Sequence, residues 1–187
     1  MNHLGTVTIE TERLILRKFT EADADAAFRN WMSDPEVTKF LRWPTHKTIA
    51  VTDWVLRDWI SHYDDPAFYQ WGIVPKALGE PIGSISVVEQ DERIGKLHIG
   101  YCIGRTWWHQ GYTSEALAAL IPFFFEQVRA GRIEAIHDPE NPHSGNVMKK
   151  CGLTYEGTLR RADWNNRGIV DACMYALLAE DYFSNSK

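Results

Sequence analysis

The sequence has few cysteines, no long hydrophobic run and no excess of positive charge. Its three cysteines, Cys102, Cys151 and Cys173, are widely spaced and form no C-x-x-C motif, so neither a disulfide framework nor a zinc site is predicted. No stretch approaches the roughly 20 apolar residues of a membrane span, and no basic segment followed by an apolar run opens the chain. We therefore expect a cytoplasmic protein with reduced thiols, no metal and no membrane partner.

The net charge of −5 comes without a basic stripe, which argues against a nucleic-acid partner. A negative net charge weakly favours cationic substrates such as amines, through electrostatic steering. Apolar residues make up 44% and charged residues 24% of the chain, as in ordinary soluble globular proteins. The 187 residues suffice for a substantial core and contain no repeat or linker, so one domain spanning residues 1–187 is predicted.

The N-terminal half predicts two helices and four strands. Thr20, with Asp23 three residues later, is typical of a helix start, and Asp34 followed by Pro35 ends that helix. A second helix is expected over residues 49–63, with one apolar face made of Val51, Val55, Trp59 and Tyr63. Strands are expected at residues 13–17, 68–74, 82–89 and 97–103, and the short turns between the last three favour antiparallel pairing.

The C-terminal half completes an α/β pattern. An apolar helical stripe follows Gly111 and should end at Gly131, and Pro122 inside it should bend the helix or remove one hydrogen bond. The strand expected at residues 132–137 follows this helix, so it should run parallel to residues 97–103. A short helix over residues 146–151 and a hairpin of residues 153–161 and 169–178 complete a mixed sheet flanked by helices, an α/β (α+β) fold.

Two segments carry most of the functional information. A glycine turn, His109-Gln110-Gly111-Tyr112, leads from a strand into a helix. A helix start leaves about four N–H groups free and carries roughly half a positive charge, which makes a phosphate site, although a glycine there is often only structural. The second segment holds Asn141, Ser144 and Asn146, which could do no more than cap a helix.

Together these segments make the sequence resemble the GNAT family of acetyl-CoA-dependent N-acetyltransferases, in the branch that includes the ribosomal-protein N-terminal acetyltransferases. The similarity covers nearly the whole chain, and its motifs stand in the family's order. They are Thr11-Glu12-Arg13-Leu14-Ile15-Leu16-Arg17, Ile99-Gly100-Tyr101, His109-Gln110-Gly111-Tyr112-Thr113-Ser114-Glu115-Ala116, Arg132-Ile133-Glu134-Ala135, Asn141-Pro142-His143-Ser144 with Gly152-Leu153, Glu156-Gly157-Thr158-Leu159-Arg160, and the segment from Asp171 to Tyr175.

The resemblance implies a single-domain fold whose mixed, mostly antiparallel central sheet contains two adjacent parallel strands that splay apart, here residues 97–103 and 132–137. Acetyl-CoA would be the cosubstrate, with its pantetheine arm along the exposed strand edge and its pyrophosphate on the N–H groups of residues 110–114. A backbone N–H near Cys102 or Ile103 would polarise the thioester carbonyl. The cofactor-binding positions carried over are Cys102, Ile103, Trp108, His109, Gln110, Gly111, Tyr112, Thr113, Ser114, Asn141 and Asn146.

Three positions depart from the family pattern. Trp108 stands where the turn often has glutamine or arginine, although tryptophan is familiar there in this branch. Thr113 stands where the turn commonly has glycine or alanine, and we expect its hydroxyl to contribute to phosphate binding. Met148 stands where many members have a proton-donating tyrosine, and Ser144 is the expected replacement as hydrogen-bond donor to the sulfur. Trp43, in the loop between the first two helices, and Tyr101 are expected to line the acceptor pocket.

The resemblance implies direct transfer of an acetyl group to a primary amine, either a protein N-terminal α-amine or a small amine. His98 is the candidate base because an imidazole with a pKa near 6.5 suits proton removal at neutral pH, although it could equally be a partly buried strand residue. Alternative bases are Glu89, Glu134, His137 and Glu156, and Glu156 could instead pair with Arg160 or Arg161. The competing function is a non-catalytic acyl-CoA-binding sensor, and a homodimer is possible.

Overall fold

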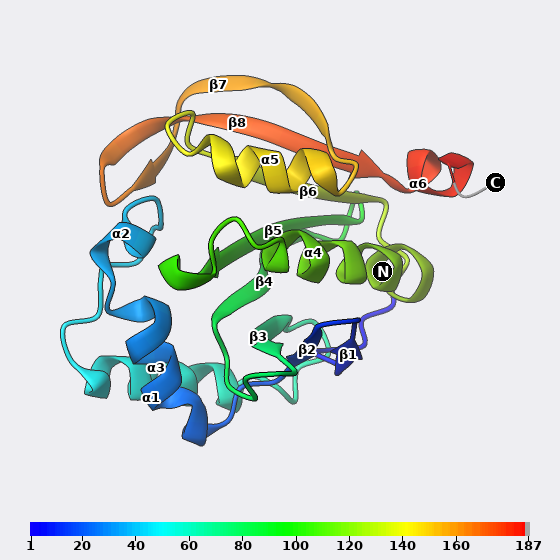
Figure 1. Cartoon of the computed structure of the whole chain (residues 1–187). Helices are drawn as coiled ribbons and strands as arrows, with labels where there is room; N and C mark the ends of the chain where they lie inside the picture. Colours follow the sequence, from blue (N-terminus) through cyan, green and yellow to red (C-terminus); the bar gives the residue numbers. More distant parts are fainter. Residues whose placement is uncertain (186–187) are drawn as a thin grey trace.

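The computed structural model describes residues 1–185, which form one eight-stranded sheet with helices on both faces (Figure 1). The strand order is β1-β2-β3-β4-β5-β6-β8-β7. Within the described chain every neighbouring pair is antiparallel except β5 and β6, which are parallel. The strands are β1 Ile9–Glu10, β2 Leu14–Arg17, β3 Gln70–Pro75, β4 Gly83–Asp91, β5 Lys96–Ile103, β6 Arg132–His137, β7 Thr154–Asn165 and β8 Gly168–Leu178.

The helices pack on the two faces of the sheet, and each face has its own hydrophobic core. Trp71 and Ile73 of β3 pack with α4 in the larger core, whereas a side chain at Gly72 would point at Phe19, which belongs to the core around α1 and α3. Figure 1 shows α4 and α5 lying side by side over the sheet. The α-helices are α1 Ala24–Ala27, α2 Pro35–Thr38, α3 Ile49–Ser61, α4 Tyr112–Pro122, α5 Pro142–Lys150 and α6 Ala179–Asn185.

The first helix begins where its sequence predicts. Thr20 and Asp23 form a capping box, and Asp23 also binds Arg17 of β2 through two hydrogen bonds of 2.7 and 2.8 Å. The helical path passes through a 3₁₀ turn, Glu21–Asp23, then α1, then a π-helical segment, Phe28–Met32. It ends before Asp34, whose side chain accepts a hydrogen bond from the Glu36 N–H at the start of α2.

Two helix expectations need correction. The apolar face expected for α3 is confirmed in part, because Val55 and Trp59 pack against the core around α1 and α3. Val51, however, is 42% exposed, and the fully buried positions of the helix are Thr52 and Leu56. The helix expected over residues 146–151 begins earlier, at Pro142, because a proline at the first helical position has no N–H to leave unpaired.

The proline inside the long helix changes its geometry as predicted. The α-helical part, α4, ends at Pro122, and the chain continues as a π-helical segment, Phe123–Val128. Proline cannot donate to the carbonyl four residues earlier, so the hydrogen-bond pattern shifts there. The helix ends at Arg129, a left-handed residue with φ of 64°, two residues before the expected Gly131.

The parallel strands splay apart, as expected. The paired residues of β5 and β6 are Lys96 with Arg132, Leu97 with Ile133, and His98 with Glu134. Beyond them β5 stays paired only with β4, and β6 only with β8. We call this part of the sheet, residues 99–103 of β5 facing residues 135–137 of β6, the splay. Over residues 1–185 no helix is long and apolar enough to cross a membrane.

Candidate active site

The splay leaves backbone groups of β5 without a neighbouring strand on one side. From Ile99 to Ile103, β5 hydrogen bonds with β4, and the described part of β6 does not pair with it. An unpaired strand edge is a template for an added extended chain. The turn before α4 lies at the end of β5, and the start of α5 lies at the end of β6, so both flank this edge (Figure 1).

The glycine turn presents free N–H groups at the start of α4. Gly111 has φ of 81°, a left-handed conformation that favours glycine. The first helical hydrogen bond runs from Glu115 to the Gly111 carbonyl, so the N–H groups of Tyr112, Thr113 and Ser114 precede it. This turn is the predicted anion site, and His109 beside it is also left-handed, with φ of 61°.

Three side chains of the turn that are expected to contact the coenzyme make hydrogen bonds to the protein backbone. Trp108 donates to the Ile103 carbonyl at 2.9 Å, and Gln110 donates to the Thr106 carbonyl at 2.8 Å. The Ser114 hydroxyl donates to the Gly111 carbonyl at 3.0 Å. Thr113 is buried. These hydrogen bonds hold the conformation of the turn, in which the backbone N–H groups at the start of α4 stay free of helical partners.

Two cations that sequence reasoning had not singled out lie beside the turn. Arg13 pairs with Glu115 at 2.7 Å and donates to the Gln110 carbonyl at 3.0 Å. A side chain on Gly111 would lie 3.5 Å from Arg13 and 3.8 Å from Lys150. These residues, with Ser114, Glu115, Ala118 and Cys151, line a cavity of about 240 Å³. The only sequence signal for it was the motif that contains Arg13.

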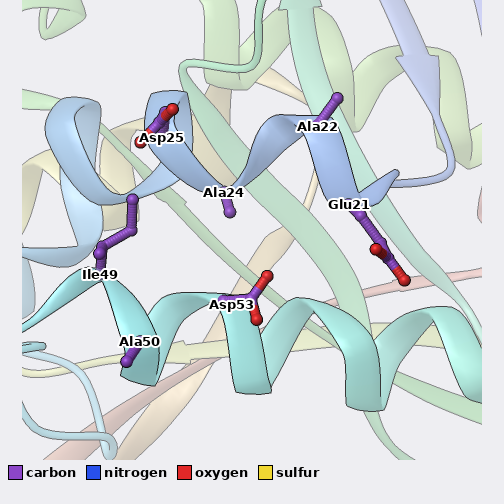
Figure 2. Close-up of a pocket in the computed structure, with 7 residues that line it drawn as sticks. All are labelled: Glu21, Ala22, Ala24, Asp25, Ile49, Ala50 and Asp53. Carbon is purple, nitrogen blue, oxygen red and sulfur yellow. The ribbon is translucent and has the colours of Figure 1, made fainter.

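A larger hollow lies elsewhere in the molecule. It measures about 340 Å³ and separates the first helical segment from α3 (Figure 2). Figure 2 shows Glu21 and Asp25 on one side and Asp53 on the other. Both Glu21 and Asp53 pair with Arg57, and none of the lining residues comes from β5, the glycine turn or α5. It therefore contributes nothing to the candidate site.

The start of α5 holds the second predicted segment. Asn141 occupies the N-cap position, yet no side-chain capping hydrogen bond forms there, and the Ser144 hydroxyl points to Tyr101 instead. Neither the Asn141 nor the Ser144 side chain therefore caps the helix through a hydrogen bond. Asn146 is exposed on α5. Gly145 allows close packing, since a side chain there would lie 2.5 Å from the His137 ring of β6.

The structure brings Tyr101 and Ser144 together. The Tyr101 hydroxyl donates to the Ser144 carbonyl at 2.8 Å, and the Ser144 hydroxyl lies 3.0 Å from the Tyr101 oxygen. Tyr101 comes from β5 and Ser144 from α5, so this contact connects the two sides of the splay. Burial raises the pKa of Tyr101.

His98 belongs to a charged cluster at the last paired step of β5 and β6. Its Nδ1 lies 3.2 Å from Glu134, which also binds Arg132 at 2.7 Å and Lys96 at 3.1 Å. Burial would raise the pKa of Glu134, but hydrogen bonds from Arg132, Lys96 and His98 hold it below its ordinary value. Burial lowers the pKa of His98 despite the opposing effect of Glu134. Both shifts favour a carboxylate beside a neutral imidazole.

The other candidate bases, Glu156, Glu89 and His137, each have an ion-pair or hydrogen-bond partner in the structure. Glu156 pairs with Arg132 at 2.5 Å, not with Arg160 or Arg161, and this contact lowers its pKa. Glu89 pairs with Lys96 at 3.0 Å. His137 donates to the Asp138 carbonyl at 2.8 Å.

The tip of the β7–β8 hairpin is joined to the loop that follows α2. Asn166 donates to the Trp43 carbonyl at 2.8 Å, and Arg42 binds Asp163 at 2.6 Å. Arg42 is close enough to His98 to disfavour its protonation. Trp43 and Cys102 pack against the same core, the one around α1 and α3, so these groups share the face of the sheet that His98 occupies.

Two further features complete the site. The rings of His109 and His143 meet edge to face, with centroids 4.6 Å apart, and so connect the glycine turn to α5.

Cys102 lies 3.4 Å from the Ser84 hydroxyl, and burial raises the pKa of its thiol, which makes it a poor nucleophile. No group of three or more metal-ligating side chains occurs in the part of the chain that the structure describes.

Comparison with known proteins agrees with this geometry. Residues 13–154 match the Acetyltransferase (GNAT) domain family. The uncharacterized N-acetyltransferase p20 of Bacillus licheniformis is 34% identical over 179 residues, which cover 94% of this chain and 98% of that protein. A GNAT-family acetyltransferase structure from Bacillus anthracis aligns with a TM-score of 0.82 at 25% identity, covering 93% of this chain and 99% of that one.

The fold is also that of a coenzyme-bound relative. The structure of RimL, described as a ribosomal L7/L12 alpha-N-protein acetyltransferase in complex with coenzyme A, aligns with a TM-score of 0.82 at 21% identity, covering 94% of this chain and 99% of that one. The family match spans the turn, the splay and α5, the parts that the sequence motifs indicated. The protein thus belongs to the GNAT family of N-acetyltransferases.

Proposed function

We propose that this protein acetylates a primary amine by direct attack of the amine on acetyl-CoA in a ternary complex, with residues 1–187 acting as one domain. The observation that carries the proposal is the unpaired β5 edge between the Gly111 turn and the start of α5. Direct attack is favoured over an acyl-enzyme because the pKa of the nearby Cys102 thiol is raised by burial.

The coenzyme would lie along the splay. Its pyrophosphate would accept hydrogen bonds from the free N–H groups of the turn, and the pantetheine arm would pair with the β5 edge and with the Asn141 side chain. A backbone N–H near Cys102 or Ile103 would polarise the thioester carbonyl, and this donor would strengthen as the oxygen gains charge.

His98 would take the proton from the attacking amine, directly or through water. The contact with Glu134 supports this role, since a carboxylate at Nδ1 favours the tautomer with its proton there and leaves Nε2 free to accept. A protein α-amine, with a pKa of about 7.7–8.0, needs little help at neutral pH, whereas a lysine-like amine, near 10.4, needs more. Ser144 would donate a hydrogen bond to the sulfur as the carbon–sulfur bond breaks.

The acceptor is either a protein N-terminal α-amine or a small amine. The RimL neighbour, by its description, acts on the α-amine of ribosomal protein L7/L12, which supports the first class. The acidic chain and the groups around Trp43, Arg42 and Asp163 are compatible with either class.

An acceptor panel tests the proposal. The purified protein would be mixed with acetyl-CoA and with peptides, amino acids, amino sugars or polyamines while free thiol is followed. Each peptide would be compared with its N-acetylated form as a matched control. We expect thiol release that requires a free amine. Coenzyme binding by calorimetry without any such release would favour the non-catalytic sensor and refute the proposal.

A further inference from the structure

Tyr101 and Ser144 form a two-hydroxyl pair inside the splay that the mechanism above uses only in part. The residues are 43 positions apart, yet their oxygens lie 3.0 Å from each other. Tyr101 lies three residues beyond His98, the last β5 residue that pairs with β6. Its side chain therefore reaches from the unpaired edge of β5 to the first turn of α5, across the place proposed for the thioester.

The hydrogen bonding of this pair can adopt two arrangements. In the structure the single Tyr101 proton goes to the Ser144 carbonyl, and Ser144 donates to the phenol oxygen. If the Ser144 proton turns toward a neighbouring sulfur, the Tyr101 proton can turn to the Ser144 oxygen. Both arrangements use the same two oxygens at 3.0 Å, so only hydroxyl hydrogens need to rotate.

We infer, resting on the proposed function, that Tyr101 is a positioning residue that holds the Ser144 hydroxyl and supports it as the thiolate leaves. The bond between the acetyl carbon and sulfur breaks, and its electron pair stays on sulfur. Ser144 donates a hydrogen bond to that sulfur, and Tyr101 donates to Ser144. No proton leaves either hydroxyl, and the proton removed from the amine passes to His98 and then to water, from which the thiolate is later protonated.

The surroundings suit this role. Burial raises the pKa of Tyr101, so the phenol keeps its proton at neutral pH and remains a donor. Hydrogen bonds that end on an anion are stronger than neutral ones, and chains of them reinforce each other. Met148 has no proton to donate, and the Cys151 thiol already donates to the Ser114 carbonyl at 3.2 Å.

A double-mutant cycle tests the inference. Tyr101→Phe, Ser144→Ala and the combined variant would be compared in kcat, in KM for acetyl-CoA and in thermal unfolding. Tyr155→Phe is the matched control, because Tyr155 is half exposed on β7 and its hydroxyl binds only Thr158 among the hydrogen bonds described.

Because Tyr101 acts through Ser144, Tyr101→Phe should lower kcat by about three- to tenfold with KM within about twofold of wild type. The same change in the Ser144→Ala background should alter kcat by less than about twofold. Tyr155→Phe should behave as wild type.

Several results would refute the role of Tyr101 and leave the proposed function standing. These are independent, multiplicative effects on kcat, a wild-type kcat in Tyr101→Phe, a loss confined to KM, or unfolding of Tyr101→Phe where Tyr155→Phe stays folded. Absence of amine-dependent thiol release from the wild type would instead refute the proposed function itself, and this role with it.

Discussion

Replacing Glu134 with glutamine removes the negative charge of this side chain and keeps its size, so it tests what the charge contributes to stability and to catalysis. The Glu134 side chain is 7% exposed and receives hydrogen bonds from Arg132, Lys96 and His98. Glutamine keeps the volume and one acceptor oxygen but removes the charge. The effect on stability depends on how well the remaining partners compensate.

The structure sets the size of that effect. Removing one partner of a buried ion pair typically costs about 3–5 kcal/mol when the other charge is stranded. Here Arg132 keeps Glu156 and Lys96 keeps Glu89, so neither cation is stranded. The loss should be nearer about 2 kcal/mol, the scale of a charged hydrogen bond, or roughly 4–8 °C in Tm for a domain of this size.

The same variant should change the pH dependence of catalysis. Burial lowers the pKa of His98, and Glu134 opposes this by stabilising the protonated ring. Without the carboxylate the pKa of His98 falls further, so the base stays neutral to lower pH. The acid limb of the kcat/KM profile, recorded with one acceptor throughout, should therefore move to lower pH, while the plateau falls because the ring loses its orienting partner.

Glu156→Gln is the control for this experiment. Glu156 binds Arg132 in the same cluster, but its side chain is 40% exposed and does not contact His98. Glu156→Gln should lower the free energy of unfolding by less than about 1 kcal/mol and leave the acid limb of the kcat/KM profile in place. An acid limb that stays fixed or moves to higher pH in folded Glu134→Gln would refute the proposed roles of both His98 and Glu134.

Three further variants test other parts of the structure. Asn141→Ala should raise KM for acetyl-CoA about tenfold with little change in Tm, since its side chain makes no capping bond; an unchanged KM would remove it from the coenzyme site. Gly145→Ala would place a carbon 2.5 Å from His137, so denaturant unfolding should show a net loss of up to about 2 kcal/mol, and equal or greater stability would contradict the packing. In Asp23→Asn the unfolding free energy at pH 7 should fall by about 1–2 kcal/mol. Burial would raise the pKa of Asp23, but hydrogen bonds from Arg17 and Thr20 lower it, so its stabilisation is present above its unfolded value of 3.8 and is lost as pH falls through the folded value. The difference between variant and wild type should therefore shrink in urea titrations at low pH, and a constant difference would contradict this account.

Local patterns predicted much of the architecture. The strand at residues 132–137 and the turn at Gly111 have the expected positions, and Pro122 ends regular α-helical geometry. The strand follows from the alternation of apolar and polar residues, the turn from the left-handed conformation that glycine tolerates, and the end of α-helical geometry from the missing N–H of proline. All three are properties of short segments. The buried face of α3 was predicted only in part: Val55 and Trp59 pack against the core as expected, but Thr52 is buried in place of Val51. That choice depends on which partner the helix meets.

The amino-acid sequence by itself determined the order of the main strands and helices, the glycine turn before α4 and the family to which the chain belongs. Only the tertiary structure decided which side chains meet: Arg13 with Glu115 across 102 residues, Tyr101 with Ser144 across 43, and His98 with Glu134 across 36. The contact of His98 with Glu134 follows from the register of β5 and β6, and a one-residue shift would turn each strand side chain to the opposite face. The other two contacts follow from the packing of α4 beside β2 and of α5 over the sheet. The chemistry proposed for this site depends on those long-range contacts.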